Sequence, residues 1–252
     1  MRLQLLLDSE NPVLLATNYQ QQIQGLIYNL LTDPLMQAFL HDHGFDYNQR
    51  RFKLFTFSRL MGKSYFNQQD KTLRITPPVL LYISSPWTEF LENLANSLLA
   101  RGFIQIGKNQ LQVKEIKLAV TPPFNQDQSY PVKMLSPVTM YSTLETREGS
   151  KKTYYYSPTE REFTRLIAQN LVKKASAFYG EDWSKLFFCI EVANSFRASQ
   201  QKIIIYKGTV IKGWLGNYHI SGHPKMLKLA YESGIGSKNS QGFGLFELCN
   251  NG

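Results

Sequence analysis

The 252-residue sequence predicts an α+β protein made of two successive units, each with the element order β-α-β-β-α-β. Short apolar runs typical of strands alternate with longer stretches whose apolar residues recur at helical spacing. A turn-rich segment, residues 121–133 with Pro122, Pro123 and Pro131, lies between the two halves. We therefore predict a first domain at residues 1–122, a linker at 123–133 and a second domain at 134–252.

In the first half, capping residues support the apolar periodicity. Asp33 can cap a helix that has Pro34 in its first turn and Gly44 as its stop. Ser85-Pro86 begins another helix, which runs to about Leu99 and is closed by Gly102. The remaining expected elements are a helix at 20–31 and strands at 2–7, 53–58, 73–76, 103–106 and 111–120. With its first helix split, this order matches the ferredoxin-like arrangement.

The second half repeats this order. Ser157-Pro158-Thr159-Glu160 has the pattern of a capping box and predicts a helix to about Phe178. Pro137 lies in an expected first strand, where it suits an edge or a strand start. The other expected elements are strands at 135–141, 186–192, 202–214 and 245–248 and a short helix at 224–232. The predicted fold is therefore two tandem ferredoxin-like domains.

Charge and composition favour a polyanionic partner. The formal net charge is +9, and residues 126–252 contribute 16 Lys and Arg against 10 Asp and Glu. Such an excess suits nucleic acid before a membrane surface, and the 13% aromatic content can supply stacking faces for bases. Cys189 and Cys249 have no pairing or metal-ligand spacing, so we expect no disulfide and no zinc. With no signal peptide and no long apolar run, the sequence predicts a soluble cytoplasmic protein.

A glycine-rich stretch near the C-terminus, Gly234–Gly244, organises the second half. Its glycines are Gly234, Gly236, Gly242 and Gly244, and Lys238 lies at its centre. Exposed amides in such a loop can form a nest for an anion such as phosphate. The order helix, loop, strand differs from a dinucleotide fingerprint, and the P-loop Gly-Lys-Ser/Thr is missing. A simple connecting turn and a mononucleotide site remain as alternatives.

The pattern G-x-G-x-x-x-x-x-G-F-G before a last strand resembles the signature of CRISPR-associated endoribonucleases that cut precursor CRISPR RNA within its repeats. These enzymes belong to the repeat-associated mysterious protein superfamily. Three first-half motifs strengthen the resemblance: Gln24–Tyr28, Leu40-His41 and Lys53–Ser58. By resemblance, Tyr28, His41 and Lys53 are catalytic, and the two-domain layout is shared.

The chemistry of these residue types agrees with RNA cleavage. The 2′-OH beside the scissile phosphate is the nucleophile, so an enzyme needs a base, an acid and positive charge. His41 can be base or acid, Lys53 a cation and Tyr28 a hydrogen-bond donor. Such a site needs no metal or other cofactor, and by resemblance gives a 2′,3′-cyclic phosphate and a 5′-OH. His43, two residues after His41, is the alternative reactive group, while Tyr28 as a core aromatic and Lys53 as a strand-end charge are the structural alternatives.

The expected partner is CRISPR repeat RNA. Besides Lys238 and the four loop glycines, the candidate RNA-binding residues are Arg50, Arg51, Lys151, Lys152, Arg197 and Lys212. We expect His219 and His223 to be structural or to contact RNA. A non-catalytic RNA-binding subunit of the same superfamily is the alternative function. The sequence leaves subunits of a CRISPR effector complex and a homodimer open as further partners.

Overall fold

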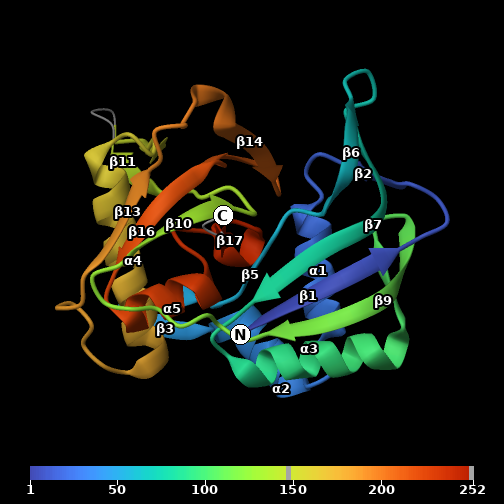
Figure 1. The fold of residues 1–252 in the computed structure, drawn as a ribbon, viewed down its shortest axis with the longest axis horizontal. Helices are drawn as coiled ribbons and strands as arrows, with labels where there is room; N and C mark the ends of the chain where they lie inside the picture. The colour runs from blue at the N-terminus through green and yellow to red at the C-terminus, as the bar shows by residue number, and fades with distance from the viewer. Residues whose placement is uncertain (146–148, 250–252) are drawn as a thin grey trace.

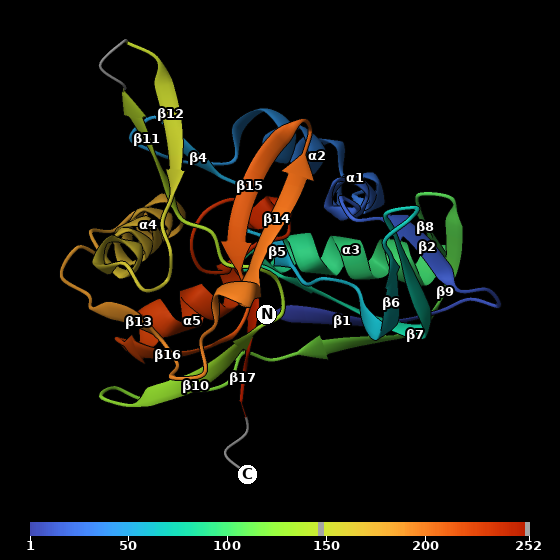
Figure 2. The ribbon, with the colours of Figure 1, turned by 90° about the horizontal axis from the view of Figure 1, so that it is seen from above.

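The computed structural model of the protein describes residues 1–145 and 149–249. Two β-sheet bodies lie side by side, one from each half of the chain (Figure 1). Seen from above, both sheets lie on one side of the molecule, with the main helices on the other (Figure 2). No helix in the described part of the chain is long and apolar enough to cross a membrane.

The N-terminal body is a seven-stranded antiparallel sheet. Its strands are β1 (Arg2–Asp8), β2 (Val13–Ala16), β5 (Thr56–Phe57), β6 (Met61–Asn67), β7 (Thr72–Ser84), β8 (Phe103–Ile106) and β9 (Asn109–Ala119). The order is β2-β7-β1-β9-β8, and β5 and β6 also pair with β7. Its helices are α1 (Gln20–Leu30), α2 (Pro34–Ala38) and α3 (Thr88–Arg101). A π-helical turn (Phe39–His43) and the hairpin of β3 (Phe45–Tyr47) and β4 (Arg50–Phe52) follow α2.

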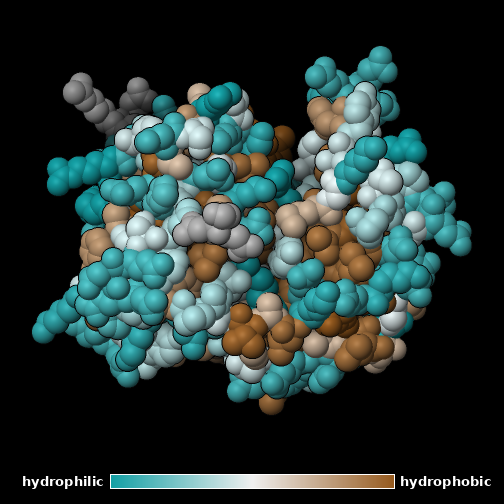
Figure 3. Space-filling model, viewed as in Figure 1, coloured by the Kyte–Doolittle hydropathy of each residue, from teal (hydrophilic) through white to brown (hydrophobic). Residues whose placement is uncertain are grey.

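The core of this body forms because alternate residues of a strand share one face. Leu3, Leu5 and Leu7 of β1 are fully buried. They belong to one apolar cluster with Ile23 and Ile27, which lie four residues apart on α1. Apolar side chains also gather on the uncovered face of the sheet, over β1, β7 and β9 (Figure 3).

The C-terminal body is a four-stranded antiparallel sheet with the order β13-β16-β10-β17. These strands are β10 (Ser129–Met134), β13 (Phe188–Val192), β16 (Asn217–Gly222) and β17 (Phe246–Leu248). The helices are α4 (Arg161–Tyr179) and α5 (Pro224–Ser233). Two hairpins extend from the sheet: β11 (Tyr141–Glu145) with β12 (Lys151–Tyr155), and β14 (Gln201–Tyr206) with β15 (Thr209–Trp214). A second apolar cluster fills this body.

Four expected strands are wrong in extent, and the one expected at 73–76 is part of the longer β7, Thr72–Ser84. The strand expected at 135–141 is instead β10 at Ser129–Met134, and all of it but Met134 lies within the expected linker. Val138 and Met140 are buried in the core outside the four-stranded sheet, and Val138 forms an isolated bridge with Trp214. The expected strand at 202–214 is the β14–β15 hairpin. The strand expected at 53–58 is reduced to β5, because Leu54 has a φ of +50° and leaves the extended conformation.

Pro131 is tolerated inside β10 because of where β17 ends. Its carbonyl accepts from the Cys249 amide, so its nitrogen faces the same side as β17. Leu248, the last residue of β17, pairs with Val132, so Pro131 lies just beyond the last strand pair of β10 and β17. Proline is acceptable in a strand at such a position.

Buried polar contacts join the two bodies. Arg2 is 3% exposed, and its guanidinium lies 3.9 Å from the ring centroid of Tyr231. It donates to the carbonyl of Phe246 at 2.8 Å and to that of Tyr231 at 3.3 Å. Thr56 of β5 donates to the Phe243 carbonyl at 2.9 Å. A buried polar group without a partner is costly, so these contacts favour a single arrangement of the bodies.

Candidate active site

The π-helical turn Phe39–His43, called the histidine turn below, presents His41. Asp33 caps α2 by accepting from the amides of Leu35 and Met36 at 2.8 and 3.4 Å, as its sequence position predicts. Gly44 ends the turn with a φ of +80°, and a Cβ there would lie 2.7 Å from the Phe52 carbonyl. Only glycine satisfies both conditions, so the turn has a defined end.

Three side chains satisfy successive carbonyls at this helix end. The last carbonyls of a helix have no partner inside the helix. The Tyr28 hydroxyl donates to the Leu40 carbonyl at 3.5 Å, and Lys53 Nζ to the His41 carbonyl at 3.0 Å. Arg51 donates to the Asp42 carbonyl at 2.8 Å. The three residues predicted to be catalytic therefore meet at one turn, and two of them hold its backbone.

The imidazole of His41 is 81% exposed and is oriented by its neighbour. His41 Nδ1 lies 2.6 Å from Asp42 Oδ1. This hydrogen bond lowers the pKa of the Asp42 carboxyl. Because Nδ1 is occupied, Nε2 is the nitrogen left for a substrate. His43 is exposed on the same turn.

Burial shifts the pKa of the other two residues. Tyr28 packs edge-on against Phe55 with ring centroids 6.0 Å apart, and burial raises its pKa to about 12. Tyr28 is therefore a neutral donor at physiological pH. Burial, followed by the nearby Arg51, lowers the pKa of Lys53.

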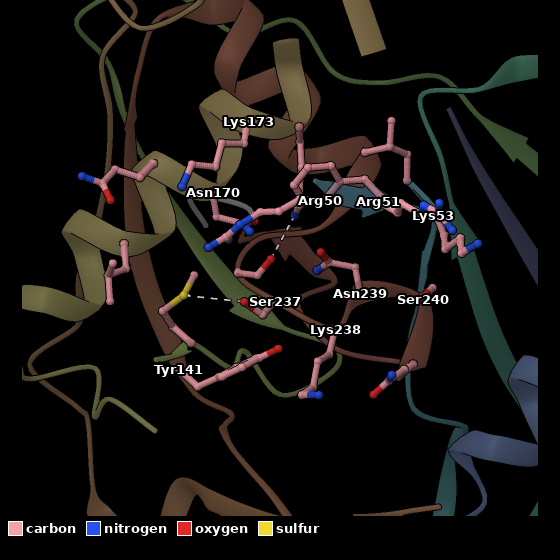
Figure 4. A pocket seen from close by; sticks show the side chains of 18 of the residues that line it. Arg50, Arg51, Lys53, Tyr141, Asn170, Lys173, Ser237, Lys238, Asn239 and Ser240 are labelled. Carbon is pink, nitrogen blue, oxygen red and sulfur yellow. Dashed lines mark hydrogen bonds between the residues drawn. The ribbon is translucent and has the colours of Figure 1, made fainter. Parts of the chain in front are cut away.

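Next to the histidine turn lies a cavity of about 750 Å³ between the two bodies. Residues 50–54 line one part of the cavity, and the segment 140–143 lines another. The remaining wall is formed by α4 and by the glycine-rich stretch Gly234–Gly244, called the glycine loop below. Lysine and arginine side chains from both bodies line it: Lys174 and, labelled in Figure 4, Arg50, Arg51, Lys53, Lys173 and Lys238. Lys238 Nζ lies 4.9 Å from the ring centroid of Tyr141. Tyr28 and His41 are not among the lining residues, so Lys53 connects the histidine turn to the cavity.

Lys174 is 2% exposed and binds the backbone of the glycine loop. Its ammonium donates to the carbonyls of Gly234 at 2.8 Å and Gly236 at 3.0 Å. Burial lowers its pKa to about 7. Inside the loop, Asn239 donates to the carbonyls of Ile235 and Phe243 at 3.1 and 2.9 Å. The loop conformation is therefore fixed by buried hydrogen bonds.

The loop glycines are buried, so close packing, and not an exposed anion site, explains why glycine is needed there. Gly234, Gly236, Gly242 and Gly244 all have positive φ. A Cβ on Gly242 would lie 2.5 Å from the Phe57 ring, and one on Gly244 would meet the Ile235 carbonyl. The expectation of an open nest of amides is wrong at Gly242 and Gly244, whose N–H groups bond within the protein. Contact between these glycines and RNA stays a prediction.

The other predicted residues lie outside this cavity. Arg197 is exposed in the connection after β13, and Lys212 is exposed on β15. His219 is exposed on β16. His223 caps α5 by accepting from the Lys225 amide at 3.3 Å, so it has a structural contact. Among the described residues, no group of three or more His, Cys, Asp or Glu side chains is placed to hold a metal ion.

Sequence reasoning missed Asn170, Lys173 and Lys174 of α4. A signal was present, since Phe163 and Ile167 are core positions of this helix. At helical spacing the same face continues at residues 170 and 174. A polar side chain on a buried helix face indicates a specific partner or ligand.

Two family models match the chain, one to each half. Residues 14–117 match "CRISPR-associated protein Cas6, N-terminal", and residues 116–248 match "CRISPR associated protein Cas6, C-terminal". Both models describe CRISPR-associated proteins, which is the class of this chain. Within it, the chain belongs to the Cas6 family, which confirms the resemblance inferred from the sequence motifs.

Relatives match over nearly the whole chain. The CRISPR-associated endoribonuclease Cas6 1 of Methanocaldococcus jannaschii is 33% identical over 253 residues, covering 97% of this chain and 91% of the relative. The CRISPR-associated endoribonuclease Cas6 of Pyrococcus furiosus is 28% identical, and the match covers 97% of this chain and 87% of the relative. A solved structure described as CRISPR associated protein Cas6 has a TM-score of 0.78 and 29% identity, covering 99% of each chain. Another, described as an RAMP protein binding different RNA substrates, has a TM-score of 0.81 and 24% identity, covering 99% of this chain and 100% of the other, and supports the fold.

Proposed function

We propose that the protein is a metal-independent endoribonuclease that cleaves CRISPR repeat RNA to produce guide RNAs. The nucleophile is the 2′-OH beside the scissile phosphate, and the products end in a 2′,3′-cyclic phosphate and a 5′-OH. The observation that carries this proposal is the histidine turn, where Lys53 binds the His41 carbonyl at 3.0 Å beside a cation-lined cavity. The naming of the relatives as endoribonucleases supports the same activity.

In this mechanism His41 transfers protons through Nε2, because Nδ1 is bound to Asp42. Lys53 has three N–H donors, of which the His41 carbonyl takes one. The other donors can stabilise the negative charge that develops on the phosphorane oxygens. Tyr28, neutral at physiological pH, fixes the preceding carbonyl of the turn.

The cavity is the proposed RNA path. Arg50, Arg51, Lys173 and Lys238 bring positive charge from both bodies to one space. Phosphate contacts of this kind supply most of the affinity of non-specific nucleic-acid binding. Arg197 and Lys212 lie away from this cavity and, if they contact RNA, do so on another part of the repeat.

We also propose that both bodies are ferredoxin-like. In the N-terminal body, β9, β1, β7 and β5 lie in this order, with α1 following β1 and α3 following β7. In the C-terminal body, β17, β10, β16 and β13 repeat the order, with α4 after β10 and α5 after β16. Each body thus follows the β-α-β-β-α-β pattern. Because β10 begins at Ser129, we place the linker at residues 120–128.

Single-turnover cleavage of a repeat RNA in EDTA tests the proposal. His41→Ala should lower the rate about 10²- to 10⁴-fold, the usual effect of losing general acid–base catalysis. A 2′-deoxy substitution at the cleavage site should abolish cleavage while RNA is still bound. His219→Ala, an exposed histidine on β16, is the matched control and should cleave normally.

The outcomes separate the candidate functions. Binding without cleavage by the unmodified protein would identify a non-catalytic RNA-binding subunit. Normal cleavage of the deoxy substrate would refute 2′-OH attack. If His43→Ala is inactive and His41→Ala is active, the reactive histidine is His43.

A further inference from the structure

Two amide side chains in the wall of the cavity have buried oxygens without a partner. Asn170 of α4 is 7% exposed, and among the described residues its Oδ1 accepts no hydrogen bond. The same holds for Oε1 of Gln241 in the glycine loop. Both residues line the cavity, and they come from elements about 70 positions apart in the sequence. The cavity wall therefore presents unused hydrogen-bonding groups from two directions.

An unpartnered buried amide is unfavourable for folding. It loses hydration without gaining a protein hydrogen bond, at a cost of about 1–3 kcal/mol. Leu171 and Ile167, the neighbours of Asn170 on the same helix face, are apolar and buried. An apolar residue at position 170 would fit that face better, so packing alone does not explain the asparagine. A ligand that enters the cavity does explain it, because the ligand supplies the missing partner.

The surroundings indicate what kind of ligand fits. A volume of about 750 Å³ lies within the usual range of small-molecule sites. Tyr141 offers an aromatic ring at the wall, and Arg50 and Lys173 offer positive charge near Asn170 (Figure 4). An aromatic face, an amide and flanking cations together suit a nucleotide with a stacked base and a bound phosphate.

We propose that this cavity is a base-selective pocket for one unstacked nucleobase of the bound RNA, read by the amides of Asn170 and Gln241. The inference rests on the proposed RNA-binding function and adds to it a source of sequence preference. Both unpartnered groups are oxygens, so each needs an N–H donor. The exocyclic amino group of adenine or cytosine has two N–H bonds and can donate to both oxygens. Uracil has a single N–H donor on its base edge and can satisfy only one of them, so it is disfavoured.

The test compares the binding of three fluorescent RNA octamers, r(A)8, r(C)8 and r(U)8, by anisotropy at fixed salt. Every protein carries His41→Ala so that the RNA stays intact. We expect the protein to bind r(A)8 or r(C)8 about 5- to 100-fold more tightly than r(U)8, the range for one amide–base pair. Asn170→Leu should abolish this preference and leave r(U)8 binding within about twofold. Asn194→Ala, which removes an exposed amide after β13, should keep the preference for r(A)8 or r(C)8 over r(U)8.

Thermal unfolding separates a ligand role from a structural one. Because the amide oxygen has no partner, Asn170→Leu should melt at the same temperature as the parent protein or higher. If this variant does not fold, the same comparison with Gln241→Leu decides the question. Equal binding of all three octamers, or a preference that survives Asn170→Leu and Gln241→Leu, would overturn the pocket. RNA binding itself would remain in that case, whereas failure to bind any octamer or the repeat RNA would overturn the proposed function.

Discussion

The buried ammonium of Lys174 predicts a pH dependence of stability that a single substitution can isolate. Lys174 joins α4 to the glycine loop through the carbonyls of Gly234 and Gly236. Burial lowers its pKa from the ordinary 10.5 to about 7 in the folded protein. Its charge is therefore present in the fold only at the acidic side of neutrality.

The sign of the effect follows from proton binding. Between pH 7 and 10.5 the unfolded chain keeps the lysine proton while the folded protein has released it. The free energy of unfolding then rises with pH, by at most about 1.4 kcal/mol per pH unit. Below pH 7 both states hold the proton, so the cost of burying the charge is fully present. From pH 7 to pH 9 the contribution of this group should grow by about 2–3 kcal/mol.

Urea unfolding at pH 6, 7, 8 and 9 measures this contribution. The unfolding free energy of the wild type minus that of Lys174→Met cancels the titration of all other groups. This difference should be flat from pH 6 to 7 and then rise. Lys202→Met, which replaces an exposed lysine of β14, is the control and should give a nearly constant difference. Parallel wild-type and Lys174→Met profiles would refute the buried titration.

Three further substitutions test the architecture of the site. Gly244→Ala should lower the unfolding free energy by about 1–3 kcal/mol or more in urea, because φ is +82° and a Cβ would meet a backbone carbonyl. Gly208→Ala, where φ is +77° but a Cβ would meet no atom within 4 Å, should lower the unfolding free energy less. An equal loss for the two variants would refute the packing role of Gly244. Lys53→Met should slow single-turnover cleavage on the order of 10²-fold by removing a donor at the charge-bearing site, with RNA affinity nearly kept; a normal rate would exclude Lys53 from catalysis. Arg2→Met should lower the melting temperature by leaving buried carbonyls unpaired, each costing about 1–3 kcal/mol, and an unchanged value would show that the bodies do not depend on Arg2.

Features set by neighbouring residues could be predicted from the sequence. Asp33 caps α2, and Gly102 ends α3 in the left-handed conformation with its amide bound to the Leu98 carbonyl. The inward face of β1 follows from the alternation of its leucines. These features depend on a few adjacent residues. The helix starts expected at Ser85 and Ser157 are wrong by a few residues, since α3 begins at Thr88 and α4 at Arg161, each without a side-chain cap. The motif around His41 also needed only local sequence.

Tertiary structure decided which of these pieces meet and what they do there. Val138 and Met140 are as apolar as strand residues, yet they lie outside the four-stranded sheet: Val138 forms an isolated bridge with Trp214 of β15, and both side chains pack in the apolar core. The four loop glycines have the sequence of an open loop but are buried; for example, Phe57 lies against Gly242 and the Ile235 carbonyl against Gly244. Asn170 and Lys174 can contribute to the cavity and to the glycine loop only because α4 packs beside that loop. Such contacts join residues far apart in the chain, and local propensity carries no information about which distant groups will exclude water from them.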